Sequence, residues 1–320
     1  KAAVEESNSY YAQGGLAAVL DTLDSPDSHV GDTLATGCGL CSERVVRHVI
    51  AEAPAHVRQM RQWGVDFDTA GNGLDLAREG GHSAHRVVHA HGDATGRALV
   101  DVLLARARDS QNIKIFDHCF VLDLLTDPPE SGLDAACVGA LTWHPRYGLQ
   151  IIRARATILA AGGAGALWRE TTNPGVATAD AMAMAFRAGA VIADCEMMQF
   201  HPTTLYVAGS TRSLISEAVR GEGAYLVDRP GRRFMDEYHE MAELAPRDVV
   251  ARAILDHMAR TNATHVYLDV RHLGSRAFAA RFPQIDRKCR AFDLDPGSDL
   301  IPVHPAAHYM IGGVQADLDG

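Results

Sequence analysis

Residues 78–92 combine glycines with a high density of histidine and arginine. The segment opens with Arg78-Glu79-Gly80-Gly81-His82-Ser83 and continues through His85, Arg86, His89 and His91. A zinc site needs ligands that converge on one point, usually with thiolate or carboxylate among them, and this segment lacks an H-E-x-x-H helix to provide that geometry. We therefore expect no metal site here, and we interpret the segment as a polar loop that faces an anionic or zwitterionic ligand.

Two glycine-rich segments could let a ligand approach the backbone closely, because glycine has no Cβ. Gln13-Gly14-Gly15 follows a run of small and polar residues, and Gly162-Gly163 follows the apolar run 154–161. Ligands of open α/β sheets bind beyond the carboxyl ends of strands, which suits the second segment. Neither segment has the G-x-G-x-x-G spacing, so a tight turn without a ligand remains the alternative for both.

The region 198–310 places cationic and hydrogen-bonding side chains in short settings rich in proline and glycine. Arginine can contact a carboxylate through two hydrogen bonds, so such groups suit the recognition of small carboxylates. Each segment alone is unremarkable, and an arginine near a helix start is commonly a solvated surface residue. The segments are Phe200-His201-Pro202-Thr203, residues 216–223 from Ser216-Glu217 to Gly223, Ala245-Pro246-Arg247-Asp248 and Ala306-Ala307-His308-Tyr309.

Composition narrows the class of protein that could carry these segments. Of the 320 residues 47% are apolar, which excludes a disordered chain. No stretch approaches the roughly 18 apolar residues of a membrane span, and the net charge of −10 argues against a nucleic-acid partner. The single C-x-x-C pair, Cys38 and Cys41, has no second pair at matching spacing. We interpret the six cysteines as buried or idle thiols of a cytosolic protein.

The elements that must position these residues follow from periodicity and from start and stop signals. Helices are predicted at 24–41, 42–63, 93–108, 178–188 and 246–260. Strands are predicted at 65–68, 113–116, 119–125, in a hairpin of 136–143 with 149–152, and near residue 191. The run 154–161 is typical of a fully buried central strand. We predict an α/β domain around a mixed sheet for 1–197, a smaller α+β domain for 198–310, and a return to the first domain in 311–320.

Nine segments, in this order, resemble the flavoprotein family of succinate dehydrogenase and fumarate reductase. The resemblance covers essentially the whole chain. It implies a FAD-binding Rossmann-like α/β domain, incomplete at both ends, with an inserted α+β capping domain at 198–310. The matching segments are Tyr11-Ala12-Gln13-Gly14-Gly15, Arg78-Glu79-Gly80-Gly81-His82-Ser83, Asp93-Ala94-Thr95-Gly96, Gly162-Gly163, Thr172-Asn173-Pro174, Gln199-Phe200-His201-Pro202-Thr203, Arg220-Gly221-Glu222-Gly223-Ala224, Ala245-Pro246-Arg247-Asp248 and Pro305-Ala306-Ala307-His308-Tyr309.

The resemblance also implies that the chain is a piece of a larger flavoenzyme. Family members begin with a strand–G-x-G-x-x-G–helix unit that holds the FAD pyrophosphate, and Lys1 falls just after it. Past Gly320 the family continues with a second flavin-contacting segment, a substrate-binding arginine and a helical C-terminal domain.

Two substitutions point to one branch of the family. Dehydrogenases of the family attach FAD covalently to a histidine where this chain has Asn8, so we expect non-covalent FAD. Enzymes acting on dicarboxylates without an amino group have an apolar aromatic residue where this chain has Glu79. A carboxylate there offers a counter-charge that only an amino acid can use. The resemblance then implies hydride transfer from L-aspartate to FAD, giving iminoaspartate, with O₂ or fumarate as electron acceptor. Quinolinate synthase would take the product towards NAD in the cytoplasm.

The resemblance assigns roles residue by residue. His201 and His308 bind the substrate carboxylates, Ser216 and Glu217 line the same pocket, and Glu79 binds the ammonium. Arg247 is the acid/base residue, and because arginine is a poor base it needs a carboxylate relay, for which Glu217 is a candidate. The expected FAD contacts are Lys1, Asn8, Ser9, Tyr10, Tyr11, Ala12, Gln13, Gly14, Gly15, Gly162, Gly163 and Asp180. The alternatives are a fumarate reductase or succinate dehydrogenase type of flavoprotein, and a catalytically inactive fragment.

Overall fold

The computed structural model describes residues 1–127, 135–209 and 213–320, which form two compact units. The first unit comprises Lys1–Asn8, Ala105–Gln199 and Ala307–Gly320; the second comprises Ser9–Leu104 and Phe200–Ala306. The chain passes between them within α1 (Asn8–Tyr11), α4 (Thr95–Asp109), β10 (Met198–Leu205) and β13 (Ile301–Met310). The predicted domain limits at 197/198 and 310/311 stay a prediction.

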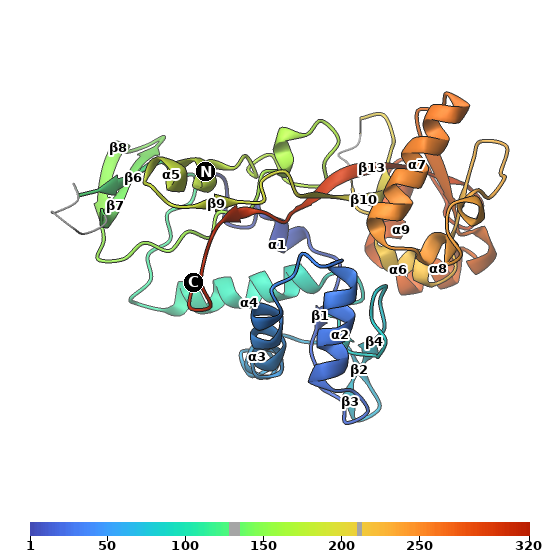
Figure 1. Ribbon diagram of the computed structural model, residues 1–320, viewed down its shortest axis with the longest axis horizontal. Coiled ribbons are helices and arrows are strands. Elements are labelled where there is room, and N and C mark those ends of the chain that lie inside the picture. Colours follow the sequence, from blue (N-terminus) through green and yellow to red (C-terminus); the bar gives the residue numbers. More distant parts are fainter. Residues whose placement is uncertain (128–134, 210–212) are drawn as a thin grey trace. The chain divides into compact units, whose positions relative to one another are not determined.

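The larger core of the second unit is built on a four-stranded sheet in the order β10-β13-β12-β11. Strands β11 (Tyr225–Val227) and β12 (Val266–Asp269) are antiparallel, as are β12 and β13, with Leu226 opposite Leu268 and Val266 opposite Val303. The helices α7 (Arg247–Thr261), α8 (Ser275–Arg281) and α9 (Pro283–Arg290), drawn in orange and red in Figure 1, contribute buried apolar residues to the same core. The predicted helix at 246–260 is confirmed as α7.

The other part of the second unit contains two longer helices and short strands. α2 (Pro26–Thr36) begins after Ser25, whose Oγ accepts a hydrogen bond from the Ser28 amide at 3.1 Å, as expected of an N-cap. α3 (Glu43–Gln62) ends before Gly64, which has a φ of +105°. Both helices were predicted and are confirmed. Strands β1 (Leu16–Ala17), β5 (Val87–Val88) and β4 (Leu76–Ala77) pair antiparallel in that order, and β2 (Thr69–Ala70) with β3 (Gly73–Leu74) forms a hairpin.

The strand predicted at 65–68 is wrong. Val65 and Phe67 are buried in the small core beside Val57 and Val88, which explains the alternating pattern. The backbone forms no sheet ladder there, and the Asp68 amide instead donates to the carbonyl of His89 at 2.8 Å. The alternation of apolar and polar residues therefore reflects the burial of every second side chain, and no neighbouring strand accompanies it.

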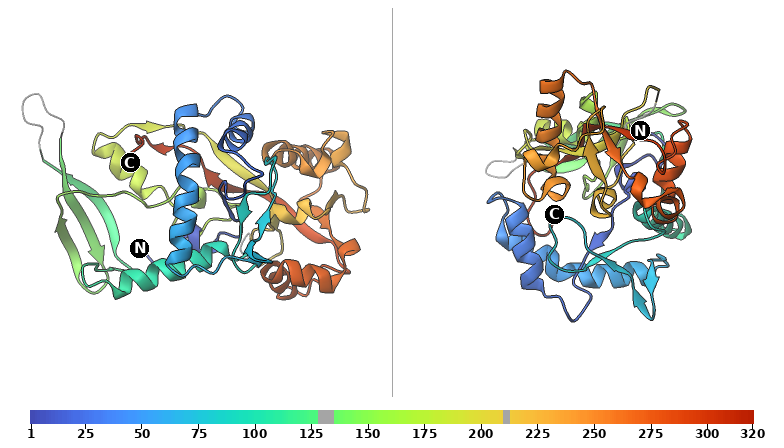
Figure 2. Two further views of the ribbon diagram at one scale, coloured as in Figure 1. Left: turned by 90° about the horizontal axis from the view of Figure 1, so that it is seen from below. Right: turned by 90° about the vertical axis from the view of Figure 1, so that its right-hand side faces the viewer.

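The first unit contains a three-stranded antiparallel sheet, drawn in green in Figure 2, of β6 (Phe120–Thr126), β7 (Cys137–His144) and β8 (Gly148–Arg153). The predicted strand 119–125 and the predicted hairpin are confirmed as these elements. α5 (Asp180–Arg187) confirms the helix at 178–188, and β9 (Ile192–Ala193) confirms a strand near residue 191. β9 pairs with β14 (Gly313–Val314), which lies in the segment Ala307–Gly320 of the same unit.

Two further strand predictions in this unit are wrong. Residues 113–116 form no strand, and residues 154–161 form neither a strand nor a buried segment, with Ile158 91% exposed. An apolar run becomes a buried strand only against partner strands. In the described residues the ladder with β7 ends at the Ala154 amide, which donates to the carbonyl of Val138 at 3.0 Å. Within the described ranges the strands fall into five separate sheets, so the single mixed sheet expected for 1–197 is corrected.

The remaining helical elements are short. They are α6 (Glu217–Gly221) and the 3₁₀ turns Gly165–Leu167, Met235–Glu237, Ala242–Leu244 and Arg271–Leu273. Among the residues that the structure describes, no helix has both the length and the apolar character needed to cross a membrane.

Candidate active site

A carboxylate between two arginines lies at the start of α6 in the second unit. Glu217 is the first residue of α6, and Arg247 is the first residue of α7. The Nε of Arg247 donates to Oε2 of Glu217 at 2.5 Å, and Nη2 of Arg220 lies 3.4 Å from Oε1. Arg220 follows Glu217 by three residues, the spacing at which side chains meet on one helix face. The structure thus supplies the contact between Arg247 and Glu217 that the sequence left open.

The second arginine of this group is deeply buried. Arg220 is 1% exposed, and burial lowers its pKa; the charge of Glu217 opposes that change, while the charge of Arg247 adds to it. Its Nη1 also donates to the carbonyl of Glu243. The sequence placed Arg220 in a candidate segment without giving it a role, although its spacing from Glu217 was a usable signal.

Glu79 lies in the loop between β4 and β5. Its Oε1 is 2.9 Å from Nε2 of His89. Burial alone would raise the pKa of Glu79, but the hydrogen bond and charge of His89 and the charges of Arg247 and His82 outweigh it and bring the pKa below its usual value. The residue is therefore a half-buried carboxylate, with 21% of its side chain exposed, that its surroundings keep charged.

The glycines after Glu79 explain how this loop approaches α6. A Cβ at Gly80 would lie 2.6 Å from Oε1 of Glu217, closer than real Cβ contacts allow. Gly81 has a φ of +81°, the left-handed region that favours glycine. Any larger side chain at Gly80 would displace the loop or Glu217, so the glycine pair lets the loop of Glu79 and the Arg247–Glu217 pair approach each other.

Buried charges hold the far end of the same loop. Arg86 is fully buried and donates to both oxygens of Asp24, at 2.8 and 2.7 Å, and to Asp32 at 2.5 Å. Asp32 also accepts hydrogen bonds from the amide and the hydroxyl of Ser83, both at 2.8 Å. The loop is therefore fastened to α2 by ionic and hydrogen bonds. Nowhere in 1–127, 135–209 or 213–320 do three His, Cys, Asp or Glu side chains come together in a way that could hold a metal.

Two other predicted substrate residues also lie in the second unit. His201 in β10 is buried, and its Nδ1 is 3.2 Å from the amide nitrogen and 3.1 Å from the carbonyl oxygen of Thr203. Ser216 caps α6, with its Oγ accepting from the Ala218 amide at 3.3 Å. The backbone thus orients both side chains.

His308 belongs to the first unit, where it lies near the end of β13. Its Nδ1 is 2.7 Å from Oγ1 of Thr172. The neighbouring Asn173 donates from Nδ2 to the carbonyl of His308 at 2.9 Å and accepts at Oδ1 from Nδ2 of Asn8 at 3.0 Å. Asn173 therefore bridges a predicted flavin contact and a predicted substrate contact.

The predicted FAD residues of the second unit include an unsatisfied buried amide. Gln13 is 4% exposed, and neither its Oε1 nor its Nε2 has a hydrogen-bond partner in the described part of the chain. A buried amide without partners costs free energy, which a polar ligand group would recover. A Cβ at Gly15 would lie 2.2 Å from the carbonyl oxygen of Val88, whereas Gly14 faces open space. Ser9, Tyr10 and Tyr11 lie in α1, and Ala12 follows them.

The predicted FAD residues of the first unit form a second group. Nζ of Lys1 binds the carboxylate of Asp180, the first residue of α5, and the hydroxyl of Thr178. Gly162 has a φ of +69°, and a Cβ at Gly163 would lie 2.7 Å from Cβ of Met310. These residues, with Asn8, fit a cofactor that needs polar groups and a closely approaching backbone.

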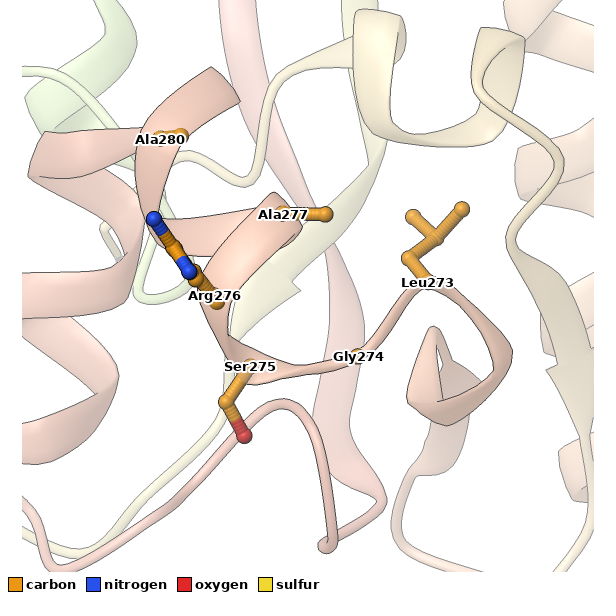
Figure 3. A pocket seen from close by; sticks show the side chains of 6 residues that line it. All are labelled: Leu273, Gly274, Ser275, Arg276, Ala277 and Ala280. Carbon is orange, nitrogen blue, oxygen red and sulfur yellow. The ribbon is translucent and has the colours of Figure 1, made fainter.

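The second unit also has a surface pocket, which is formed by residues other than the predicted site residues. It is an open depression lined by Leu273, Gly274, Ser275, Arg276, Ala277 and Ala280, around the start of α8 (Figure 3). None of the predicted site residues lines it, so it has no part in the proposed chemistry.

Comparison with known proteins tests the predicted family. The profile of a family described as FAD binding domain matches residues 1–320. L-aspartate oxidase from Streptomyces coelicolor is 45% identical over 100% of this chain and 56% of its own length. The chloroplastic L-aspartate oxidase of Arabidopsis thaliana is 46% identical over 98% of this chain and 50% of its own length. The chain thus spans about half the length of the curated relatives it matches.

Solved structures agree with the sequence match. A quinol fumarate reductase from E. coli superimposes with a TM-score of 0.88 at 34% identity, covering 98% of this chain and 55% of that one. The fold is that of the FAD-binding domain in fumarate reductase flavoproteins, as the motifs predicted. The chain therefore belongs to the FAD binding domain family, the flavoproteins that include fumarate reductase and succinate dehydrogenase.

Proposed function

We propose that this chain, in its full-length protein, oxidises L-aspartate to iminoaspartate. FAD, when bound, supplies the chemistry by accepting a hydride from the substrate α-carbon. The observation that carries the proposal is Glu79, a half-buried carboxylate kept charged and placed on a loop that contacts Glu217 through Gly80. The similarity to L-aspartate oxidases supports it.

Glu79 would select an amino acid over a dicarboxylate without an amino group. His89 contacts Oε1, and within the described residues Oε2 accepts no hydrogen bond. Oε2 is thus available to a substrate ammonium. A buried site built around an ammonium discriminates strongly against a ligand that lacks it, because the carboxylate is then left without a partner.

Arg247 and Glu217 would move the proton that the oxidation releases from nitrogen. A guanidinium alone is a poor base, but its Nε lies 2.5 Å from Oε2 of Glu217, which can take up the proton it passes on. Arg220, 3.4 Å from the other oxygen, orients the carboxylate. In the other half-reaction, in which fumarate re-oxidises the flavin, the same pair would deliver a proton to one carbon of the fumarate double bond.

The substrate carboxylates would bind His201 and His308, and the hydroxyl of Ser216 would contact the substrate as well. FAD would be held non-covalently, because the amide of Asn8 cannot form the bond that a histidine forms. Its contacts would be the twelve residues predicted from the sequence, among which Gln13 carries an unsatisfied buried amide.

Residues 1–197 and 311–320 would form the Rossmann-like FAD domain, and 198–310 the capping domain that closes over the substrate. O₂ or fumarate would re-oxidise the flavin, and quinolinate synthase would use the product in cytoplasmic NAD synthesis.

Anaerobic mixing of the full-length protein with L-aspartate tests the proposal. L-aspartate should bleach the flavin absorbance near neutral pH, and succinate should not. Bleaching by succinate alone would favour a fumarate reductase or succinate dehydrogenase, the alternative supported by the structural match. If the 320-residue chain, purified by itself, showed no flavin spectrum, the result would favour the alternative of a catalytically inactive fragment.

A further inference from the structure

The segment Thr171-Thr172-Asn173 is joined to the end of β13 by backbone and side-chain hydrogen bonds. The amide of Thr172 donates to the carbonyl of Ala307 at 3.1 Å, and Oγ1 of Thr171 donates to the same carbonyl at 2.9 Å. The amide of Ala307 in turn donates to the carbonyl of Glu170 at 2.8 Å. All of these residues belong to the first unit. These hydrogen bonds hold the backbone of residues 170–173 against the end of β13, independently of the side-chain contacts with His308.

The amide of Asn173 has a defined orientation. Its Nδ2 donates to the carbonyl of His308 at 2.9 Å, and a carbonyl can only accept. Its Oδ1 accepts from Nδ2 of Asn8 at 3.0 Å. With the NH₂ group thus turned towards β13, Nδ2 also lies 3.5 Å from the carbonyl oxygen of Ala307 and 3.5 Å from Oγ1 of Thr172, and towards both it can only be the donor.

This orientation limits where the hydroxyl of Thr172 can donate. Of the two side-chain groups near its oxygen in the described residues, the NH₂ of Asn173 can only donate, so Nδ1 of His308, 2.7 Å away, is the one that can accept the hydroxyl proton. A ring whose Nδ1 accepts a hydrogen bond carries its proton on Nε2 when neutral. In the other tautomer the proton on Nδ1 of His308 would face the hydroxyl proton of Thr172, unless the hydroxyl turned away from the ring.

We propose that Thr172 is a positioning residue that holds His308 in the tautomer with a proton on Nε2, so that Nε2 can donate to a substrate carboxylate. This inference rests on the proposed role of His308 in substrate binding. The opposite tautomer would present a lone pair to the carboxylate and repel it. The Thr-Asn-Pro segment, which the family resemblance singled out without a role, thereby gains one in orienting the substrate.

The test combines a spectroscopic and a kinetic readout on the full-length protein. Histidines are labelled with ¹⁵N, and the His308 signals are assigned by their loss in His308→Gln. The wild type and Thr172→Ser should show the Nε2–H tautomer, whereas Thr172→Val should lose that preference. Thr171→Val is the matched control, because it removes the two hydrogen bonds of the neighbouring hydroxyl, to the carbonyl of Ala307 and from the amide of Asn173, without touching the ring, and it should keep the tautomer. In Thr172→Val the KM for L-aspartate should rise on the order of tenfold, with a smaller change in kcat.

Two results would overturn the proposal. One is an unchanged His308 tautomer in Thr172→Val; the other is an equal rise in KM in Thr171→Val, which would mean that the segment only stabilises β13. If Thr172→Val does not fold, Thr172→Ala removes the hydroxyl without adding a branched side chain and carries the same test. Failure of the proposed function would look different: L-aspartate would not reduce the wild-type flavin, and the tautomer signals would still be measured.

Discussion

Glu79 and Glu217 are two carboxylates of the second unit, and Gly80 brings their segments together, yet their partners differ. Glu217 has a guanidinium on each oxygen, Arg247 at 2.5 Å and Arg220 at 3.4 Å. Glu79 has one imidazole, His89, on one oxygen. The first carboxylate is compensated by two guanidinium groups, and the second retains an oxygen for a further cation. In the proposed function, the number of cationic partners would separate the carboxylate that relays protons from the one that selects the substrate.

The largest effect is expected from Glu217→Gln, which removes the carboxylate proposed to take up the proton from Arg247. An amide cannot take a proton from Arg247, so kcat for L-aspartate should fall by about 10³-fold, within the range of general acid–base contributions. Rapid-mixing measurements of flavin reduction would give the rate. The flavin spectrum and thermal midpoint of the variant serve as controls for folding, and a loss of kcat below about tenfold with intact flavin would contradict a relay role.

The next effect concerns the buried charges that hold the loop of Glu79. Arg86→Met leaves the buried carboxylate of Asp24 without its partner and should cost about 3–5 kcal/mol of unfolding free energy. Arg47→Met is the matched control, because Arg47 pairs with Asp27 and Glu43 at an exposed site, where such pairs contribute about 0–1 kcal/mol. Urea unfolding of both variants measures the difference. Similar costs in the two variants would show that the cluster does not fasten the loop.

A smaller effect is expected in the pH dependence of substrate binding. The pKa of Glu79 lies below its ordinary value of 4.5, so the charge of Glu79 is present above that value and is lost only as the pH falls through the lower, folded-state pKa. His89→Gln removes the leading contribution that opposes burial, so the pKa of Glu79 should rise. KM for L-aspartate should then begin to increase at a higher pH than in the wild type, by a few-fold near pH 5. Identical pH profiles would mean that His89 does not keep Glu79 charged.

Much of the local structure could be predicted because its signals are local. Ser25 before α2, Gly64 after α3 and the turn between β7 and β8 are set by neighbouring residues. The strands at 65–68 and 154–161 were wrong because a strand depends on partners far along the sequence. Alternation at 65–68 reported burial alone, and the run 154–161 remains exposed in the described structure.

The site divides in the same way. Arg220 could have been found from its spacing of three residues after Glu217, because both lie on one short helix. The contacts of Glu79 with His89 and of Thr172 with His308 could not, since no pattern in the sequence specifies which of 16 histidines meets which partner. The buried cluster of Arg86, Asp24 and Asp32 likewise joins residues more than 50 positions apart.

The central claim, that Glu79 selects for an amino group, is tested most directly by Glu79→Gln in the full-length protein. Both half-reactions would be measured, reduction of the flavin by L-aspartate and its re-oxidation by fumarate. We predict that kcat/KM for L-aspartate falls on the order of 100-fold, because the ammonium loses its counter-charge, while fumarate reduction changes little. Equal losses in both half-reactions would contradict the claim.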